Sequence, residues 1–306
     1  MNAPPRTLAA AGRTLELGDR PLLMGIVNAT PDSFSDGGEA RTSEQRVELA
    51  ASMLAAGADL IDIGGESGVT NRPPVDADEE IERVVPLIER VVGELGALVS
   101  VDTYKPSVAR AAIAAGACIV NDVSGLRDPG LADVCAETGA ALVLMHTRVA
   151  PKQKMLDRTY DGGVVEDVLT FLAERIQLAL SRGVAFEQLI VDPGPDFAKT
   201  PAQTVEALRS LDRLHELARP ILLAVSRKDF VGAITGRSPR RRLAGTLAAL
   251  AHGVDAGAHI LRVHDVAEVA DFLAVRAVLS GRLELDPGLR LDTQIRWDQG
   301  SIGRPR

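Results

Sequence analysis

Short apolar runs alternate with longer amphipathic segments along most of the chain, and four of the boundaries between them follow one pattern. In each, an amphipathic segment ends at a glycine, and an alanine and a short aliphatic run follow it. The four glycines are Gly57, Gly116, Gly139 and Gly257. A helix that ends at a glycine and leads into a buried strand is the αβ half of a βαβ unit. The pattern therefore predicts a repeated strand–helix unit with parallel strands.

Eight of the apolar runs have the length of a strand, and helical periodicity fills most of the gaps between them. The candidate strands are 22–28, 59–65, 98–103, 118–124, 141–147, 189–194, 221–226 and 259–266. The candidate helices are 44–56, 77–92, 106–115, 129–137, 164–182, 202–216, 240–256 and 267–279. Eight such units predict a single closed (β/α)8 TIM barrel of the α/β class, because a doubly wound sheet normally has fewer strands.

The barrel is expected to occupy residues 21–284. Residues 1–20 form an N-terminal extension, in which residues 13–18 are expected to pair as a short strand across the bottom of the barrel. Residues 285–306 carry glycine, proline and arginine without helical periodicity. This composition predicts a weakly ordered tail, with Trp297 as its one candidate anchor.

Polar residues begin abruptly where the apolar runs end, as at Glu66, Asn121, His146 and Arg262. In barrel enzymes the active site lies at the C-terminal ends of the strands. The pattern therefore predicts an enzyme with its site at that end of the barrel. His146 by itself fits a hydrogen-bonded histidine of the barrel rim at least as well as a catalytic one.

Composition and charge narrow the class of protein. The chain has 306 residues, 46% of them hydrophobic, which is enough for one large α/β core. Its net charge of −8 disfavours nucleic acid and anionic membranes as partners, so an anionic ligand needs a local cationic pocket. No apolar run approaches the roughly 18 residues of a membrane span. Cys118 and Cys135 are expected to be buried and reduced, and we expect a cytoplasmic protein.

The segment 24–38, which reads MGIVNATPDSFSDGG, is the most informative motif. Asn28 ends the first strand, and the side-chain oxygens of Asp32, Ser33, Ser35 and Asp36 follow it. These are ordinary turn residues, but the loop leaves the predicted catalytic face. A carboxylate there suits a divalent cation or a developing positive charge.

Four further polar residues come from the ends of four different strands, namely Asp102, Asn121, Asp192 and Lys228. Asp102 and Asp192 each precede a helix by a few residues, so each one alone fits a helix N-cap about equally well. As a converging set, the four residues bring carboxylate, amide and ammonium groups to one place. Such a set favours a ligand site over helix capping.

Arg262 and His264 alternate along the last strand, so their side chains share one face of it. The next helix begins close by, and its N-terminus favours anions. With Asn28 and Ser226, the pair suits a diphosphate. The alternative is a salt-bridged arrangement that involves Asp265.

The chain resembles the dihydropteroate synthase family of pterin-binding TIM-barrel enzymes. The resemblance rests on the segment 24–38 and on seven motifs that follow it in order. These are DIGGES (62–67), VSVDT (99–103), NDVSG (121–125), LMH (144–146), DPG..FAKT (192–200), SRK (226–228) and RVHDV (262–266). Each motif falls at the end of one strand, which makes the resemblance specific.

The resemblance implies a transferase of folate biosynthesis. It would condense 6-hydroxymethyl-7,8-dihydropterin diphosphate with para-aminobenzoate and release 7,8-dihydropteroate and diphosphate. It implies Mg²⁺ as the cofactor, with Asn28 as the metal-binding residue, and a homodimer formed through the outer helices. The two small molecules are the only substrates it implies.

The resemblance also assigns the site residues. The pterin falls to Asp102, Asn121, Asp192 and Lys228, and the diphosphate to Arg262 and His264, whose role is to help it leave. Asp36 is assigned a place over the resulting methylene cation. The aminobenzoate pocket falls to Phe197, Lys228 and Ser226, with Thr70 and Arg72 from the second loop. Catalytic roles fall to Asp36, Lys228, Arg262 and His264.

Three departures from the family pattern bear on the second substrate. The second loop reads GVTNRPP after Glu66-Ser67, so extra residues surround Thr70 and Arg72. Asp196 and Asp229 add negative charge near the pocket for a carboxylated amine. Two alternatives follow, a diverged pterin-binding paralogue without synthase activity and a pterin-dependent methyltransferase module. The second would normally accompany a cobalamin domain, which this sequence does not show.

Overall fold

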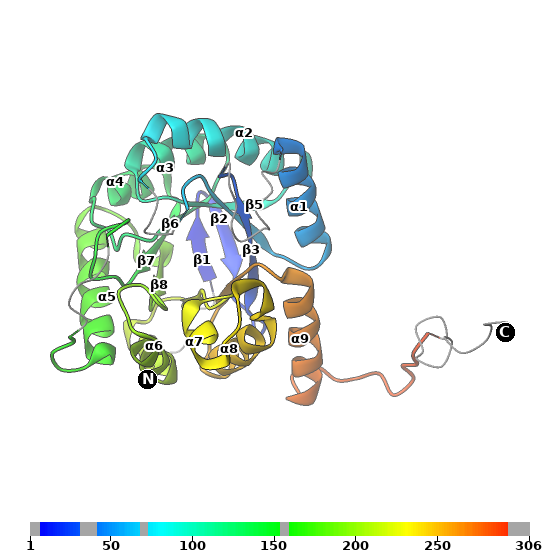
Figure 1. The fold of residues 1–306 in the computed structure, drawn as a ribbon. Coiled ribbons are helices and arrows are strands. Elements are labelled where there is room, and N and C mark those ends of the chain that lie inside the picture. The colour runs from blue at the N-terminus through cyan, green and yellow to red at the C-terminus, as the bar shows by residue number, and fades with distance from the viewer. Residues whose placement is uncertain (1–6, 31–41, 68–72, 154–158, 293–306) are drawn as a thin grey trace.

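The computed structural model describes residues 7–30, 42–67, 73–153 and 159–292 of the chain. Eight parallel strands lie in the order β8-β7-β6-β5-β4-β3-β10-β9. They are β3 (Leu22–Asn28), β4 (Leu60–Gly64), β5 (Leu98–Asp102), β6 (Ile119–Asp122), β7 (Ala141–Met145), β8 (Leu189–Asp192), β9 (Leu222–Leu223) and β10 (Ile260–Val263). A parallel bridge from Val191 to Ile221 joins the two end strands and closes the sheet (Figure 1). The predicted TIM barrel is confirmed.

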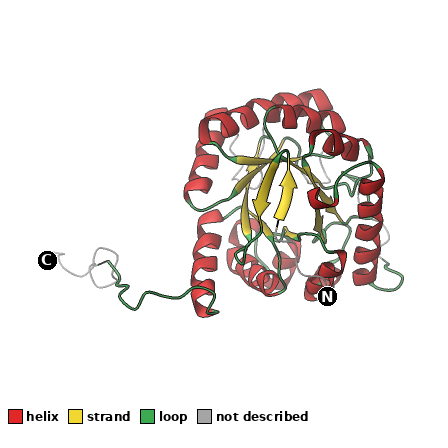
Figure 2. Cartoon of the chain, turned by 180° about the vertical axis from the view of Figure 1, so that it is seen from behind, coloured by secondary structure: helices red, strands yellow, loops and turns green. Residues whose placement is uncertain are grey.

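Helices surround the barrel as an outer layer (Figures 1 and 2). They are α1 (Ser43–Ala55), α2 (Ala77–Leu95), α3 (Pro106–Ala114), α4 (Gly130–Thr138), α5 (Val164–Ser181), α6 (Pro201–Arg209), α7 (Asp229–Thr235), α8 (Leu243–Asp255) and α9 (Val266–Leu279). Short 3-10 turns add η2 (Phe186–Gln188), η3 (Leu211–Leu217) and η4 (Pro239–Arg241). The apolar faces of the helices pack on the outside of the strands and form the main core.

The four glycines of the sequence repeat have the backbone that the pattern predicts. Gly57, Gly116, Gly139 and Gly257 all have positive φ angles, between 73° and 110°. This left-handed conformation costs glycine little, and it ends each helix so that the chain can turn into the next strand. The repeat therefore sets the helix–strand connections at the bottom of the barrel.

The structure corrects the predicted elements in the last third of the barrel. The segment 202–216, predicted as one helix, is α6 followed by η3, and the helical hydrogen bonding changes at Ser210. The segment 240–256 begins later, as α8, and α7 was not predicted. The strand predicted at 221–226 shortens to β9, because the chain beyond Leu223 turns to form the site loop.

A β-hairpin closes the bottom of the barrel. Strands β1 (Thr7–Ala10) and β2 (Arg13–Glu16) pair antiparallel and lie across the N-terminal ends of the barrel strands (Figure 2). Leu8 and Leu15 of the hairpin pack with the inward-facing side chains of the barrel, among them Met24 and Ile190. The expected short strand across the bottom is thus the second strand of this hairpin. With the bottom sealed, ligands can reach the barrel only from the C-terminal ends of its strands.

Candidate functional site

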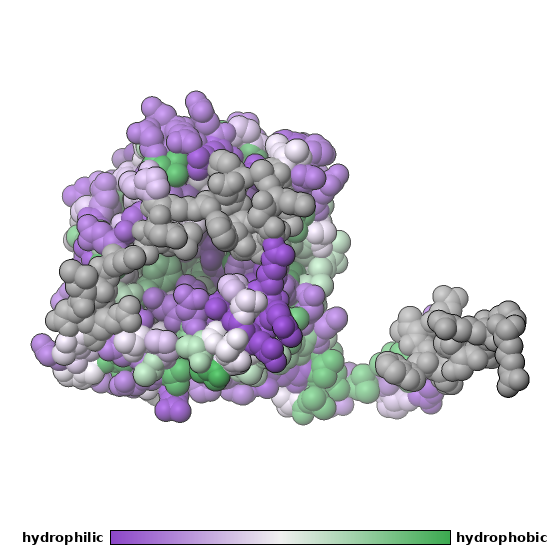
Figure 3. Space-filling view, in the orientation of Figure 1, coloured by the Kyte–Doolittle hydropathy of each residue, from purple (hydrophilic) through white to green (hydrophobic). Residues whose placement is uncertain are grey.

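The polar residues that end the strands meet at the open mouth of the barrel. Figure 3 looks onto this end and shows a hollow over its centre, with hydrophilic side chains inside it. Asp102 and Asp192 end β5 and β8, and Asn121 is the last residue but one of β6. Lys228 follows β9, and Arg262 lies on β10. Because the strands are parallel and in register around the ring, their ends meet at one place.

Arg262 links two carboxylates across the mouth. Its Nε lies 2.6 Å from Oδ2 of Asp62, and its Nη2 lies 2.7 Å from Oδ2 of Asp102. Burial disfavours the charge on Arg262, but the two carboxylates outweigh that cost and raise its pKa. Neither helix capping by Asp102 nor a bridge from Arg262 to Asp265 occurs here. Instead, Asp265 pairs with Arg227.

Asp62 holds this arrangement from the wall of the barrel. Its side chain is fully buried, and the same Oδ2 that binds Arg262 accepts a hydrogen bond from the Asn121 amide at 3.2 Å. No partner reaches its other oxygen, Oδ1, among the described residues. Burial raises the pKa of Asp102 to about 7, against the lowering effect of Arg262, and the Asp62 charge adds to the rise.

Asp192 and Lys228 lie on the opposite side of the mouth. Asp192 is only 3% exposed, and its Oδ1 accepts a hydrogen bond from the backbone N–H of Gly194 at 2.7 Å. Burial raises the pKa of this carboxyl group. Burial also lowers the pKa of the Lys228 ammonium group, and the negative charges of Asp196 and Asp192 partly offset that lowering. The Nζ of Lys228 lies 4.2 Å from the centre of the Phe197 ring, a cation–π distance.

His264 and Ser226 form a hydrogen-bonded pair between β9 and β10. The Oγ of Ser226 accepts a hydrogen bond from the backbone N–H of His264 and lies 3.0 Å from its Nδ1. The hydroxyl can donate to Nδ1, an arrangement that leaves the ring proton on Nε2. Burial, with help from Arg227 and Arg262, lowers the pKa of His264 to about 3, so the ring is neutral at pH 7.

Asn28 ends β3, which pairs with β10 in the barrel. Its backbone carbonyl accepts a hydrogen bond from Arg46 of α1 at 3.1 Å, which fixes the start of the first loop. The part of the chain that the structure describes contains no group of three or more histidine, cysteine, aspartate or glutamate side chains suited to a metal ion.

The two aspartates that depart from the family pattern have structural partners. The carboxylate of Asp196 accepts hydrogen bonds from the Thr204 hydroxyl and from the backbone N–H of Phe230, near the start of α7. Asp229 pairs with Arg242 at 2.8 Å, and its side chain is 88% exposed. The charge of Asp229 thus faces solvent, and that of Asp196 stabilises a helix start.

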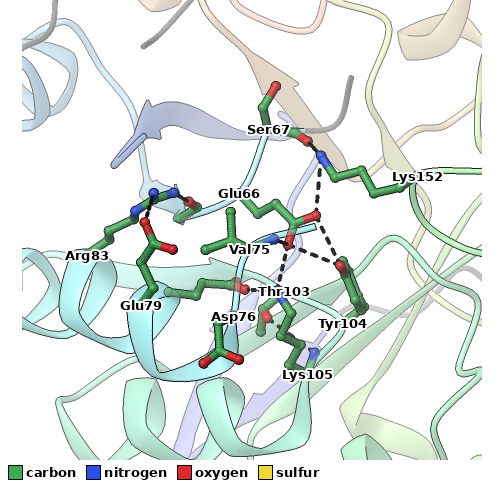
Figure 4. Close-up of polar contacts among 12 residues, drawn as sticks. Glu66, Ser67, Val75, Asp76, Glu79, Arg83, Thr103, Tyr104, Lys105 and Lys152 are labelled. Carbon is green, nitrogen blue, oxygen red and sulfur yellow. Dashed lines mark hydrogen bonds and ion pairs between the residues drawn. The ribbon is translucent and has the colours of Figure 1, made fainter. Parts of the chain in front are cut away.

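Glu66 is the centre of a polar cluster beside the mouth (Figure 4). Its carboxylate is 6% exposed and accepts hydrogen bonds from the Tyr104 hydroxyl, the Lys105 ammonium group and the backbone N–H of Val75. Burial alone would raise its pKa, but Lys105 and the other donors outweigh that and lower it. Lys152 lies 3.3 Å from Glu66 and donates to the Ser67 carbonyl. The cluster joins β4, α2 and the loops that follow β5 and β7.

Three of the predicted site residues, Asp36, Thr70 and Arg72, lie outside the described residues, as does Trp297. Nine others lie at or beside the mouth, which is where their roles require them: Asn28, Asp102, Asn121, Asp192, Phe197, Ser226, Lys228, Arg262 and His264. Their individual roles stay predictions.

Sequence reasoning assigned no role to Asp62, Glu66 or Lys199. Each lies inside a quoted motif, but its partners are distant in the sequence, for example Arg262 for Asp62 and His146 for Lys199. The one available signal was a charged residue inside or directly after a predicted buried strand, which applies to Asp62 and Glu66. Nothing in the local sequence distinguishes Lys199 from an ordinary loop lysine.

None of the helices in the described part of the chain has the length and apolar character needed to cross a membrane.

The chain is similar in sequence and fold to dihydropteroate synthases. A family model described as "Pterin binding enzyme" matches residues 24–264. Dihydropteroate synthase of Bacillus subtilis is 43% identical over 82% of this chain and 86% of its own length. The Escherichia coli enzyme is 39% identical over 90% and 97%. A solved structure of the Xanthomonas albilineans enzyme with 4-aminobenzoic acid superposes with a TM-score of 0.82, at 45% identity, and covers 90% of this chain and 98% of that one.

These matches cover most of the chain, and they favour the synthase over the paralogue and methyltransferase alternatives. The two aspartates that suggested a diverged paralogue have structural partners. The chain belongs to the pterin-binding enzyme family and, within it, to the dihydropteroate synthases, which are transferases.

Proposed function

We propose a role for each described site residue in the reaction of a dihydropteroate synthase. The reaction joins 6-hydroxymethyl-7,8-dihydropterin diphosphate to para-aminobenzoate. The bond between the pterin methylene carbon and the diphosphate oxygen breaks, and a new bond forms from that carbon to the amine nitrogen. The amine loses one proton, and the products are 7,8-dihydropteroate and diphosphate.

The observation that carries the assignment is the convergence of Asp102, Asn121, Asp192 and Lys228 on one mouth. A pterin ring presents a row of N–H donors on one edge and a carbonyl and ring nitrogen on another. Carboxylate and amide oxygens match the donor edge, and an ammonium group matches the acceptors. The buried carboxylate of Asp192 accepts from Gly194 through one oxygen, so its other oxygen remains suited to the pterin.

Arg262 and His264 would bind the diphosphate and stabilise it as it leaves. The guanidinium group provides positive charge at the mouth of this acidic chain, in addition to that of Lys228. His264 is neutral at pH 7, so it would contribute an Nε2–H hydrogen bond, and Ser226 would hold the ring in that tautomer. Stabilising negative charge on the leaving group speeds a dissociative displacement more than activating the amine would.

Mg²⁺ fits the donor set at Asn28 because this ion keeps several waters and binds through few protein oxygens plus phosphates. An amide oxygen one strand away from Arg262 and His264 provides such a ligand. When bound, the ion would supply charge neutralisation to the diphosphate. Mg²⁺ as the cofactor and Asn28 as its ligand are both proposals.

Phe197 and Lys228 would form the described part of the aminobenzoate pocket. The ring provides an apolar wall, and the ammonium group above it attracts a carboxylated amine. Thr70, Arg72 and Asp36 would complete this side from the first two loops. The amine is already neutral at pH 7, so positioning and exclusion of water would account for most of the catalysis.

We further propose that the enzyme acts as a homodimer in the cytoplasm. Val275 and Leu279 of α9 are 60% and 82% exposed, which is unusual for large apolar residues on a helix. Both cysteines are buried and unpaired, as suits a reducing compartment. Sedimentation equilibrium tests the dimer: wild type should have twice the mass of the chain. A monomer at micromolar concentration would contradict it.

The function is tested by mixing purified protein with the pterin diphosphate, Mg²⁺ and para-aminobenzoate and measuring dihydropteroate by chromatography. We expect product from wild type. Replacing Arg262 by Met should lower kcat by about 100-fold or more, the effect of losing one preorganised charge stabiliser. Wild-type protein that binds the pterin but forms no product would contradict the proposal.

A further inference from the structure

Lys199 is a buried lysine between the site loop and the end of β7. It is only 5% exposed. Its Nζ donates hydrogen bonds to the backbone carbonyls of Gly194 at 2.9 Å and Phe197 at 3.2 Å. A third contact, at 2.6 Å, joins Nζ to Nδ1 of His146, a ring that is itself fully buried. No substrate role falls to Lys199, yet it lies directly behind two site residues.

The hydrogen-bond partners of His146 determine which of its two ring nitrogens carries the proton. The Nε2 of His146 lies 2.8 Å from Oδ2 of Asp167, on the first turn of α5, and Arg148 pairs with the same carboxylate. A carboxylate only accepts, so Nε2 carries the ring proton and Nδ1 presents a lone pair to Lys199. All three partners of Nζ are therefore acceptors. Three acceptors match the three N–H bonds of an ammonium group.

The loop that Lys199 binds adopts an unfavourable backbone. Gly194, Asp196 and Ala198 all have left-handed φ angles, of 62°, 65° and 55°. Two of these residues carry a Cβ, for which this conformation is disfavoured. A Cβ at Gly194 would lie 2.0 Å from the backbone oxygen of His146, so the loop also passes very close to the end of β7. Contacts outside the loop must hold it in this shape.

The same loop connects the two substrates of the proposed function. The N–H of Gly194 binds the Asp192 carboxylate, and the carbonyl of Gly194 accepts from both Lys199 and the backbone N–H of Phe197. One peptide segment thus fixes the carboxylate proposed for the pterin and the ring proposed for the aminobenzoate. The cross-link from Lys199 to His146, directly after β7, is attached to the same segment.

We propose that Lys199, held by the Asp167–His146 pair, is a positioning residue that fixes the loop 193–198 and so places Asp192 and Phe197 for the two substrates. It does not touch the reacting atoms. The proposal rests on the proposed function.

Loss of a proton from Lys199 should change the contacts of the loop, and this change can be measured as a pH dependence. Burial lowers the pKa of Lys199 to about 7. The charged groups that face it are Asp167 from α5, Asp192 from β8, Asp196 from its own loop, Lys228 from the loop after β9 and, across His146, Arg148. The ammonium form is complete below this pKa and is lost as the pH rises through it. A neutral amine has two N–H bonds for three acceptors, so the loop should loosen on the alkaline side.

The test compares wild type with Lys199→Met and Lys199→Arg over pH 6 to 9, with KM measured for each substrate and kcat measured in parallel. In Lys199→Met we expect the KM for para-aminobenzoate to rise about tenfold, because the variant loses one or two charge-assisted hydrogen bonds that hold the loop. The KM for the pterin diphosphate should rise less, since the other contacts of Asp192 remain. In wild type the KM for para-aminobenzoate should rise above pH 7. In Lys199→Arg it should stay level, because a guanidinium group does not titrate there.

Arg219→Met is the matched control. Arg219 is 7% exposed and, like Lys199, donates to backbone carbonyls, those of Ala218 and Phe186, away from the site residues. It should lose stability but keep both KM values. Unchanged KM values in Lys199→Met, or an alkaline rise that persists in Lys199→Arg, would overturn the proposal. If Lys199→Met does not fold, Lys199→Arg alone decides. Wild type without product would instead refute the proposed function.

Discussion

Ionisable side chains inside this barrel are either paired as charges or kept neutral. At the mouth, charges are kept and paired, as Arg262 is with Asp62 and Asp102. Such pairs cost stability, because desolvation offsets most of their attraction, and they are common where a charged ligand must bind. Other groups are kept neutral, as His264 is at the mouth and the half-buried His259 is at the bottom. His259 there accepts a hydrogen bond from the backbone N–H of Ile221 through Nδ1 at 3.1 Å.

His259 should make the fold sensitive to acid. Burial, with help from His215, lowers its pKa from 6.5 to about 4, so the unfolded chain binds a proton more readily than the folded one. The stability contributed by the neutral ring is complete above pH 6.5 and is lost as the pH falls toward 4. We expect His259 to account for about 2 kcal/mol of unfolding free energy lost between pH 7 and pH 4.5.

Urea unfolding of wild type and His259→Asn at both pH values measures this loss. The asparagine oxygen can still accept from the Ile221 N–H, but it does not titrate. The variant should therefore lose about 2 kcal/mol less than wild type between the two pH values. An equal loss in both proteins would mean that other groups cause the acid sensitivity.

Loops rather than helices place the chemistry in this barrel. The loop 193–198 and the cluster around Glu66 each fix their backbone through side chains from neighbouring elements. The tightest contact is at Gly194, where the absence of a side chain lets the loop approach the His146 carbonyl. Gly236, which ends α7, has a similar φ of 67° but open space around it.

Substituting these two glycines by alanine separates steric overlap from backbone strain. Gly236→Ala should lower the free energy of unfolding by about 1 kcal/mol, because the left-handed conformation is unfavourable for alanine. Gly194→Ala adds a steric clash with the His146 carbonyl, which belongs to the backbone and cannot move aside. This variant should therefore lower the free energy of unfolding by about 3 kcal/mol or more, and it should also lower activity. Thermal unfolding measures both. Equal losses would show that the loop can move away from β7 at little cost.

At the same scale, the sequence predicted most elements but not all. Strands and helices in the first two thirds follow from the glycine-ended repeat, which recurs with full-length helices. The helical pattern is weak between β8 and α8: α7 has seven residues, too few for a clear helical period, and η3 has no such period. Residues at strand ends could be predicted as a site because parallel strands bring their ends together. The Lys199–His146 contact could not, since no local pattern relates residues that meet only in the fold.

The whole molecule is an acidic barrel with a hairpin across its bottom and cationic side chains at its mouth. The hairpin of β1 and β2 fills the bottom, and the net charge is −8. Lys228 and Arg262 provide the cationic groups at the mouth, each opposed by carboxylates from other strands. This arrangement accounts for selective binding of a ligand that carries both donor groups and negative charge.

The most direct test of the account is pterin binding at this mouth. Isothermal titration calorimetry with 6-hydroxymethylpterin compares wild type with Lys228→Met. We expect micromolar binding to wild type and an affinity at least about 100-fold lower in the variant. The reason is that removing the lysine leaves the buried carboxylate on the Asp192 side of the pocket without a positive partner. Arg219→Met should bind like wild type. Equal affinity in wild type and Lys228→Met would contradict the claim that the polar strand ends form the pterin site.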